Sequence, residues 1–367
     1  MRRTFAIALA LCLTAAACSQ RAQEAQRLLS DIAAGPDPSR LKAETPVPER
    51  RAARFPGGSG DLYVSPEGTL GALVLVPGLA ETGKDDPRLI AFAHSLARAR
   101  FAVLVPDIVS LRALQVRPGD SVIIAEAAHW LATDSGFAPR RRVGVIGISY
   151  AAGPAMLATL VPGAGAAIEF VLAVGGYHDI DRMVVFFTTG DYRLGGVWRH
   201  LEPNAYGKWV FVASNAGHLD DAADRALLAR IADLKLEDPS LDVSRLAARL
   251  GRQGQAVLAL VDNDNRTATA ALIAGLPAGI RHDMAALDPA RAALETAKAR
   301  FLLIHGRDDS IVPYSESVDL AARLGPAAAS LYLLDGMWHV DSDFSLADQW
   351  ILWDAAIKLL ELRDGVR

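Results

Sequence analysis

Cysteine and clustered basic residues are what this chain of 367 residues has least of. Its only two cysteines, Cys12 and Cys18, lie close to the start, so no disulfide bond can staple the rest of the chain. The formal net charge is -4 at pH 7, and no basic block or basic–aromatic patch occurs. Nucleic-acid binding requires such a patch. These shortages exclude a disulfide-stabilised body and argue against a nucleic-acid partner.

Patterns typical of metal and cofactor sites are also missing. Four histidines of the middle region show no metal-ligand spacing. They are His178, His200, His218 and His282. Residues 78–84 do spell the G-x-x-x-x-G-K of a phosphate-binding loop, but Asp85 stands where a Ser or Thr would hold Mg²⁺, and Asp86 follows. Two carboxylates oppose phosphate binding, so we expect no cofactor and no metal.

The first residues have the pattern of an export signal. Arg2 and Arg3 precede an apolar stretch, residues 5–17, that is too short to span a bilayer. The stretch ends in three alanines directly before Cys18, which resembles a bacterial lipobox, where the cysteine is lipidated and becomes the new N-terminus. The alternative is an ordinary secretory signal with an A-x-A cleavage site and an incidental cysteine.

We therefore predict a signal peptide over residues 1–17 and a lipid on Cys18 that anchors the chain to the cell envelope. Ser19 is not the aspartate that favours retention at the inner membrane, so the outer membrane, facing the periplasm, is the expected location. A soluble periplasmic or secreted protein is the alternative. Residues 18–50 are polar and contain four prolines, which predicts a lipidated N-terminus followed by a flexible tether with one helical turn around residues 25–32.

Short apolar runs alternate with helical patterns along the rest of the chain. Asp86 is a typical N-cap, Pro87 follows at the first helical position, and residues 120–137 form a second helical pattern. The apolar runs are residues 70–76, 101–105, 143–148, 170–174, 301–304 and 331–334. Runs of this kind suit parallel strands that are covered on both faces. The alternation predicts an α/β fold with a mostly parallel central sheet, and residues 55–64 add an antiparallel hairpin at one edge.

One long interval interrupts the alternation. Residues 177–298 contain helical spacings but no strong central strand, and they far exceed an ordinary loop. We predict a largely helical cap over the C-terminal ends of the strands, where open α/β sheets bind ligands. The remaining core comprises residues 51–176 and 299–367.

A serine follows the apolar run 143–148 and precedes a helical pattern. Gly147-Ile148-Ser149-Tyr150-Ala151 matches G-x-S-x-G with alanine in the last place. Small flanking residues are needed where a serine stands on a sharp strand-to-helix turn, because neighbouring backbones come close there. The same pattern also occurs in ordinary strand–helix turns, so the motif alone leaves both a turn residue and a nucleophile open.

Two partner residues follow in the required order. Asp309 lies in HGRDDSIVP after the run 301–304, and His339 ends DGMWH after the run 331–334. With these pieces the chain resembles the α/β-hydrolase fold enzymes (serine esterases, lipases and dienelactone hydrolases) from about residue 60 to its C-terminus. It departs from that family's pattern at Ala151, usually glycine, and at Pro77, where many members have histidine.

The resemblance implies a serine hydrolase that forms an acyl-enzyme with a small-molecule acyl substrate. Ser149 is the expected nucleophile, His339 the general base, and Asp309 the acid that orients the imidazole. Backbone N–H groups of Leu79 and Tyr150 are expected to form the oxyanion hole. An acyltransferase or serine peptidase could use the same residues, and a non-catalytic envelope lipoprotein could keep the fold.

Other residues have competing interpretations. Asp308 is expected to be a solvated loop residue, although it is also a second candidate for the acid. Asp179 and Asp181 follow the run 170–174, another place where this fold can carry its acid. His305 is expected to pack and hydrogen-bond at a strand end.

Overall fold

An eight-stranded sheet forms the centre of the molecule in the part of the chain that the structure, a computed structural model, describes: residues 20–338, 341–342 and 345–366. The strand order is β1-β2-β4-β3-β5-β6-β9-β10. The strands are β1 (Glu49–Phe55), β2 (Gly58–Val64), β3 (Gly71–Val76), β4 (Phe101–Pro106), β5 (Val143–Ile148), β6 (Ile168–Val174), β9 (Arg300–Gly306) and β10 (Ala329–Leu334). From β4 to β10 all neighbours are parallel, and β1 and β2 form an antiparallel hairpin on β4.

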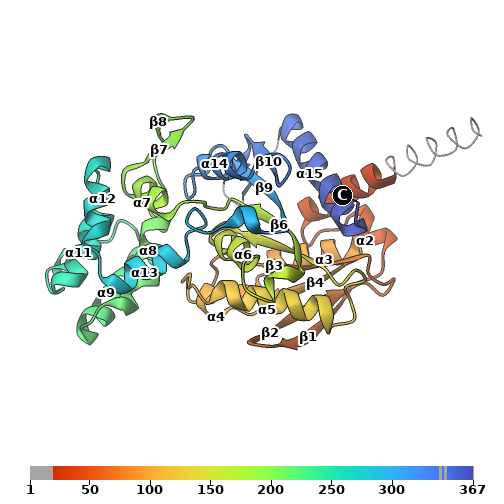
Figure 1. Ribbon diagram of the computed structural model, residues 1–367, viewed down its shortest axis with the longest axis horizontal. Coiled ribbons are helices and arrows are strands. Elements are labelled where there is room, and N and C mark those ends of the chain that lie inside the picture. Colours follow the sequence, from red (N-terminus) through yellow and green to blue (C-terminus); the bar gives the residue numbers. More distant parts are fainter. Residues whose placement is uncertain (1–19, 339–340, 343–344, 367) are drawn as a thin grey trace, which may run out of the picture.

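Helices cover both faces of this sheet (Figure 1). One face packs against α5 (Asp120–Thr133), α6 (Ala152–Ala158) and α14 (Ser315–Leu324). The other packs against α3 (Pro87–Arg98) and α15 (Leu346–Asp364). The expected start of α3 is confirmed, because the Asp86 side chain accepts from Arg88 N–H and Pro87 opens the helix. The strand order, together with the helices on both faces of the sheet, confirms the predicted α/β-hydrolase fold.

Burial explains why the apolar runs become central strands. Every residue of β3 and of β4 is buried, as expected for strands covered on both faces. A side chain at Gly144 in β5 would place its Cβ 2.0 Å from the ring of Phe170 in β6, so this glycine is required by the neighbouring strand. The β5–β6 ladder also shifts its register between Val143 and Gly144, so this glycine marks both close packing and an irregularity of the strand.

The segment between β6 and β9 forms a body with its own apolar core, on the left in Figure 1. Its helices are α7 (Ile180–Thr189), α8 (Tyr206–Asn215), α9 (Ala222–Glu237), α10 (Ser244–Ala247), α11 (Arg252–Val261), α12 (Arg266–Ala274) and α13 (Ala278–Ala286). It also contains a hairpin of β7 (Asp191–Leu194) and β8 (Val197–His200), which the sequence analysis did not predict. All four residues of β8 are exposed, so the hairpin has none of the apolar alternation that reveals a half-buried strand.

The N-terminal part of the described chain differs from the tether expected over residues 18–50. Residues 20–34 are helical, α2 (Arg40–Glu44) follows, and Ala25 and Leu28 are 0% and 1% exposed against the α15 side of the sheet. Trp353 Nε1 of α15 donates to the carbonyl of Ala22 at 2.9 Å. A narrow apolar stripe thus docks a helix in place of the expected flexible tether, and the helical turn expected around residues 25–32 is part of this longer helix.

Two predicted features fall outside the described residues. They are the signal peptide over residues 1–17 and the lipidation site at Cys18. Within the described ranges, no helix combines the length and the apolar character needed to cross a bilayer.

We expect Leu28→Ala to lower the free energy of unfolding by about 2–5 kcal/mol, because it leaves a cavity under the docked helix. Gln26→Ala is the matched control on the exposed side of the same helix and should change stability by less than about 0.5 kcal/mol. Urea unfolding of both variants measures the difference. Two equal, near-zero effects would show that residues 20–34 are not docked in solution.

Candidate active site

Ser149 stands at the strained turn between β5 and α6. β5 ends at Ile148, a single 3₁₀ turn (Ser149–Ala151) follows, and α6 begins at Ala152. Ser149 has φ = 55°, a left-handed backbone that costs a non-glycine residue about 1–2 kcal/mol, and it is only 6% exposed. Such a turn lifts a serine hydroxyl off the C-terminal edge of an α/β-hydrolase sheet.

Two glycines flank this turn, and neither has room for a side chain. A Cβ on Gly147 would lie 2.8 Å from Ala155 Cβ, and one on Gly153 would lie 2.2 Å from the ring of Tyr177. Ala151, which replaces the usual glycine, is fully buried at φ = -73°, a conformation that every residue adopts without strain. The departure at Ala151 therefore does not disturb the turn, whereas Gly147 and Gly153 leave no space for a side chain.

The loop after β3 touches the turn. A Cβ on Gly78 would lie 3.4 Å from Ser149 Cβ and 3.4 Å from the carbonyl oxygen of Ile148. Leu79 follows Gly78 directly, and Tyr150 follows Ser149, so the two expected oxyanion residues lie on two segments in contact. Their role as hydrogen-bond donors stays a prediction.

Asp309 is the buried member of the pair that follows β9. Its side chain is 1% exposed, and Oδ1 accepts from the backbone N–H groups of Ile311 at 2.8 Å and Val312 at 3.0 Å. Asp308 is exposed, as expected for a solvated loop residue. The backbone bonds hold one oxygen of the Asp309 carboxylate in a defined direction, which an orienting acid requires.

His305 supports the same loop from inside. Its side chain is fully buried, Nδ1 lies 2.7 Å from Ser317 Oγ, and Nε2 lies 2.9 Å from the carbonyl oxygen of Val312. Nε2 is also 3.5 Å from Asp309 Oδ2. Both ring nitrogens thus face neighbouring groups of the loop, in agreement with the expected packing role.

The loop expected to carry the base begins against the acid loop. A Cβ on Gly306 would lie 1.8 Å from the carbonyl oxygen of Met337 in the short strand β11 (Met337–Trp338), which pairs with β12 (Asp341–Ser342). His339 itself lies outside the described residues.

The two alternative acids have structural tasks. The Asp179 side chain caps α7 by accepting from Arg182 N–H at 3.0 Å. Asp181 is paired with Arg291 at 2.8 Å and is half exposed. Neither residue has the buried, doubly hydrogen-bonded carboxylate oxygen that Asp309 shows.

The Tyr150 side chain places a buried hydroxyl at the candidate site, whereas the sequence had pointed only to the backbone N–H of this residue. Its ring lies 6.4 Å from that of Tyr177, and Gly207 of α8 comes so close that a Cβ there would be 2.9 Å from the Tyr150 Oη. Among the described residues this Oη has no hydrogen-bond partner. Burial raises the pKa of Tyr150 well above its ordinary value, so the phenol stays a neutral donor at the boundary between core and insertion.

Side chains of α14 form hydrogen bonds with both of the chain segments that connect the core to the insertion. Glu316 Oε2 accepts from the backbone N–H groups of His178 at 3.0 Å and Asp179 at 2.7 Å, where the insertion begins. Arg323 donates to the carbonyl of Ala290 at 3.0 Å, where the insertion ends, and Ala290 N–H donates to the His178 carbonyl at 2.8 Å. We call Glu316, Arg323 and the two segments they bind the α14 clasp. Burial raises the pKa of Glu316 to about 7.

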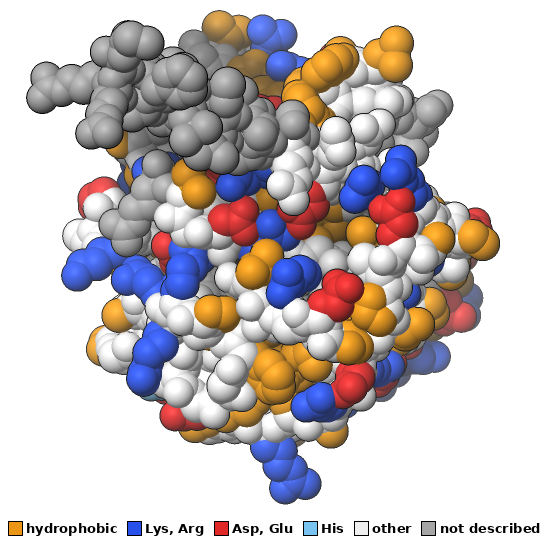
Figure 2. Space-filling view, turned by 90° about the vertical axis from the view of Figure 1, so that its right-hand side faces the viewer, with side chains coloured by type: hydrophobic (Ala, Val, Ile, Leu, Met, Phe, Trp, Pro, Cys, Tyr) orange, Lys and Arg blue, Asp and Glu red, His pale blue; other side chains and the backbone are white. Residues whose placement is uncertain are grey.

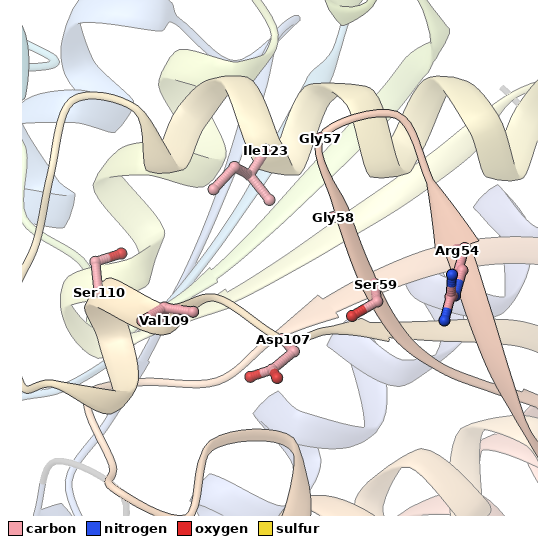
Figure 3. A pocket seen from close by; sticks show the side chains of 8 residues that line it. All are labelled: Arg54, Gly57, Gly58, Ser59, Asp107, Val109, Ser110 and Ile123. Carbon is pink, nitrogen blue, oxygen red and sulfur yellow. The ribbon is translucent and has the colours of Figure 1, made fainter.

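A separate hollow of about 620 Å³ lies between the β1–β2 turn, the loop after β4 and α5 (Figure 3). Its lining residues are Arg54, Gly57, Gly58, Ser59, Asp107, Val109, Ser110 and Ile123. None of the predicted site residues is among them, so this hollow is not the predicted active site.

No protein-family model matches the chain, and a search of curated proteins finds no relative. Similar solved structures include an acylaminoacyl peptidase in complex with Z-Gly-Gly-Phe-chloromethyl ketone, at 14% identity and a TM-score of 0.48. A puromycin-hydrolyzing peptidase from Mycobacterium tuberculosis has 15% identity and a TM-score of 0.47. EstE7, an HSL homolog from a metagenome library, has 13% identity and a TM-score of 0.44.

The alignments with the acylaminoacyl peptidase, the mycobacterial peptidase and EstE7 cover 86%, 87% and 88% of this chain. They cover 42%, 40% and 89% of the other chains, so this chain spans less than half the length of the two peptidases. The fold class follows from the strand order, and these distant resemblances assign no activity.

We expect Ser149→Gly to be more stable than Ser149→Ala by about 1 kcal/mol, since glycine adopts the left-handed backbone without strain. Ala151→Gly, in the same turn at an ordinary φ, is the control and should lower stability by about 0.5–1 kcal/mol. Thermal unfolding of the variants measures both. Equal stability of the two Ser149 variants would contradict the strained turn.

We expect Glu316→Gln to flatten the pH dependence of unfolding. Because burial raises the folded-state pKa of Glu316 to about 7, folding favours its protonated form, and that stabilisation is lost as pH rises from the unfolded-state pKa through about 7. Between about pH 5 and 7 the wild type should therefore lose up to about 1.4 kcal/mol per pH unit relative to the variant. Urea unfolding over this range tests it, and parallel profiles would contradict it.

Proposed function

We propose that the chain is a serine hydrolase that cleaves a carboxylic ester or a related acyl bond through an acyl-enzyme intermediate. The observation that carries the proposal is the left-handed backbone of Ser149 at the strand-to-helix turn, since strain of this kind persists only where the surrounding structure holds it. The second support is Asp309, whose buried carboxylate lies on the loop after β9, in the chain order that an α/β-hydrolase requires.

In the proposed reaction Ser149 Oγ attacks the acyl carbon while His339 takes its proton. Asp309 holds the imidazole in one tautomer and stabilises the imidazolium. Backbone N–H groups of Leu79 and Tyr150 stabilise the oxyanion, and losing one such donor typically costs about 3 kcal/mol of transition-state stabilisation. His339 then protonates the leaving group, and water resolves the acyl-enzyme with the same base. The reaction requires no cofactor.

The same groups would serve a serine peptidase or an acyltransferase, because the leaving group and the acceptor are selected outside the triad. A panel of p-nitrophenyl esters, aminoacyl anilides and thioesters, each with water or an added alcohol as acceptor, separates the three activities.

We further propose that the enzyme is anchored through a lipid on Cys18 in the outer membrane, facing the periplasm. Exchange of Cys18 for serine should release it to the soluble fraction with its esterase activity intact.

A fluorophosphonate probe tests the nucleophile and the acid together. We expect a covalent adduct at Ser149 by peptide mass spectrometry, no adduct in Ser149→Ala, and labelling that weakens below about pH 6 as His339 becomes protonated. Asp309→Asn should slow labelling by about 10⁴-fold, the loss found when a triad acid is replaced. The matched control is Asp308→Asn, an exposed neighbour, which should change the rate by no more than a few fold.

Two results would contradict the proposal in different ways. Full ester hydrolysis by Ser149→Ala would exclude Ser149 as the nucleophile and leave it as a turn residue. A larger loss in Asp308→Asn than in Asp309→Asn would move the acid to the exposed residue and leave the enzyme class intact.

A further inference from the structure

Two large apolar side chains are exposed at the start of α15. Leu346 is 77% exposed and Trp350 is 67% exposed, and their spacing of four residues places them on one face of the helix. We call them the α15 patch. The ring of Trp350 meets that of Trp353 edge to face at 5.2 Å, and Trp353 packs on the core of the molecule. Trp353 therefore connects the exposed Trp350 ring to the core of the molecule.

The helical turn that carries the patch has no exposed charge of its own, although Asp354, one turn further along the same face of α15, is exposed. Ala347 and Gln349 are exposed and uncharged, whereas Asp348 is 1% exposed, because both its oxygens are engaged at the start of the helix. Among residues 346–350 no charged side chain faces the solvent. An apolar environment could therefore cover this turn without removing a charge from water.

The predicted anchor point lies near α15, in the part of the helix from Trp353 to its C-terminal end. Ala22 is held on α15 by the hydrogen bond from Trp353, and Arg21 pairs with Asp364 at 3.1 Å. Cys18 precedes Ala22 by four residues, which span at most about 14 Å when fully extended. Had residues 18–50 been a free tether, the lipid could have lain about 100 Å from the body. The docked helix instead confines the lipid to the neighbourhood of α15.

We propose that Leu346 and Trp350 insert into the headgroup–acyl boundary of the membrane that holds the Cys18 lipid, and so fix the orientation of the hydrolase on that membrane. The proposal rests on the lipidation proposed above. Because Cys18 lies at most about 14 Å from Ala22, a bilayer that receives its lipid lies on the side of the molecule where α15 and the docked helix meet. Tryptophan prefers the boundary between lipid and water, because its ring is apolar and its N–H is polar.

Figure 2 looks at the right-hand side of the molecule in Figure 1, where hydrophobic side chains stand out at the upper rim beside Lys and Arg side chains. Because the exposed part of the patch is uncharged, the interaction is apolar rather than electrostatic and should depend little on salt or on anionic lipid. The other occupant that an apolar patch could have is a second copy of the chain, which the test separates.

The test uses the mature lipidated protein in phosphatidylethanolamine vesicles whose acyl chains are brominated near the headgroup. Bromine quenches tryptophan only at short range. We expect Trp350→Phe to lose at least half of the quenching seen in the wild type. Trp198→Phe is the matched control, since Trp198 is also exposed, at 45%, but lies on the β7–β8 hairpin. It should retain the wild-type quenching, and Leu346→Asp should weaken quenching without detaching the protein.

Equal quenching in the wild type and Trp350→Phe would overturn the proposal. So would a dimer in detergent that dissociates on Trp350→Phe or Leu346→Asp, which would assign the patch to a second copy. The mass of the N-terminal peptide reports the lipid separately, and its absence would remove the premise of the proposal. Fluorophosphonate labelling of Ser149 in every variant confirms folding and tests the proposed hydrolase independently of the membrane result.

Discussion

The close packing of α6 on β5 is the constraint on which the candidate site depends. Ser149 has a left-handed backbone directly before α6, and α6 can pack this closely on β5 because Gly147 has no side chain: a Cβ there would lie 2.8 Å from Ala155 Cβ and 2.9 Å from Ala152 Cα. The strain of about 1–2 kcal/mol is offset by burying nearly all of α6 in the core. Once Ser149 is fixed, Gly78 in the loop after β3 lies directly against it.

The parts of the structure that the sequence predicted correctly are those with a local signal. Central strands are short apolar runs because both faces are covered, and Asp86 and Pro87 mark the start of α3 by themselves. The choice of Asp309 over Asp308 as the acid stays a prediction; the structure adds that, of the two, only Asp309 is buried and bound by backbone N–H groups.

The parts that the sequence did not predict depend on distant partners. The helix at residues 20–34 is polar over most of its surface, and the groups that dock it, Trp353 and Arg363, come more than 300 residues later. Glu316 appears in a stretch that looks like an ordinary helix start, and its burial follows from the insertion that crosses above it. No short stretch of the sequence contains both partners of these contacts, because the partners meet only in the assembled fold.

The α14 clasp connects the acid loop to the position of the insertion. The loop that holds Asp309 leads directly into α14, and His305 ties the two together by contacting Ser317 of that helix. The same helix binds the start of the insertion through Glu316, while Asn204 of the insertion donates to the Ser310 carbonyl at 2.8 Å. The insertion therefore contacts the acid loop directly through Asn204 and is joined to it a second time through Glu316 of α14, so the two segments share one set of hydrogen bonds.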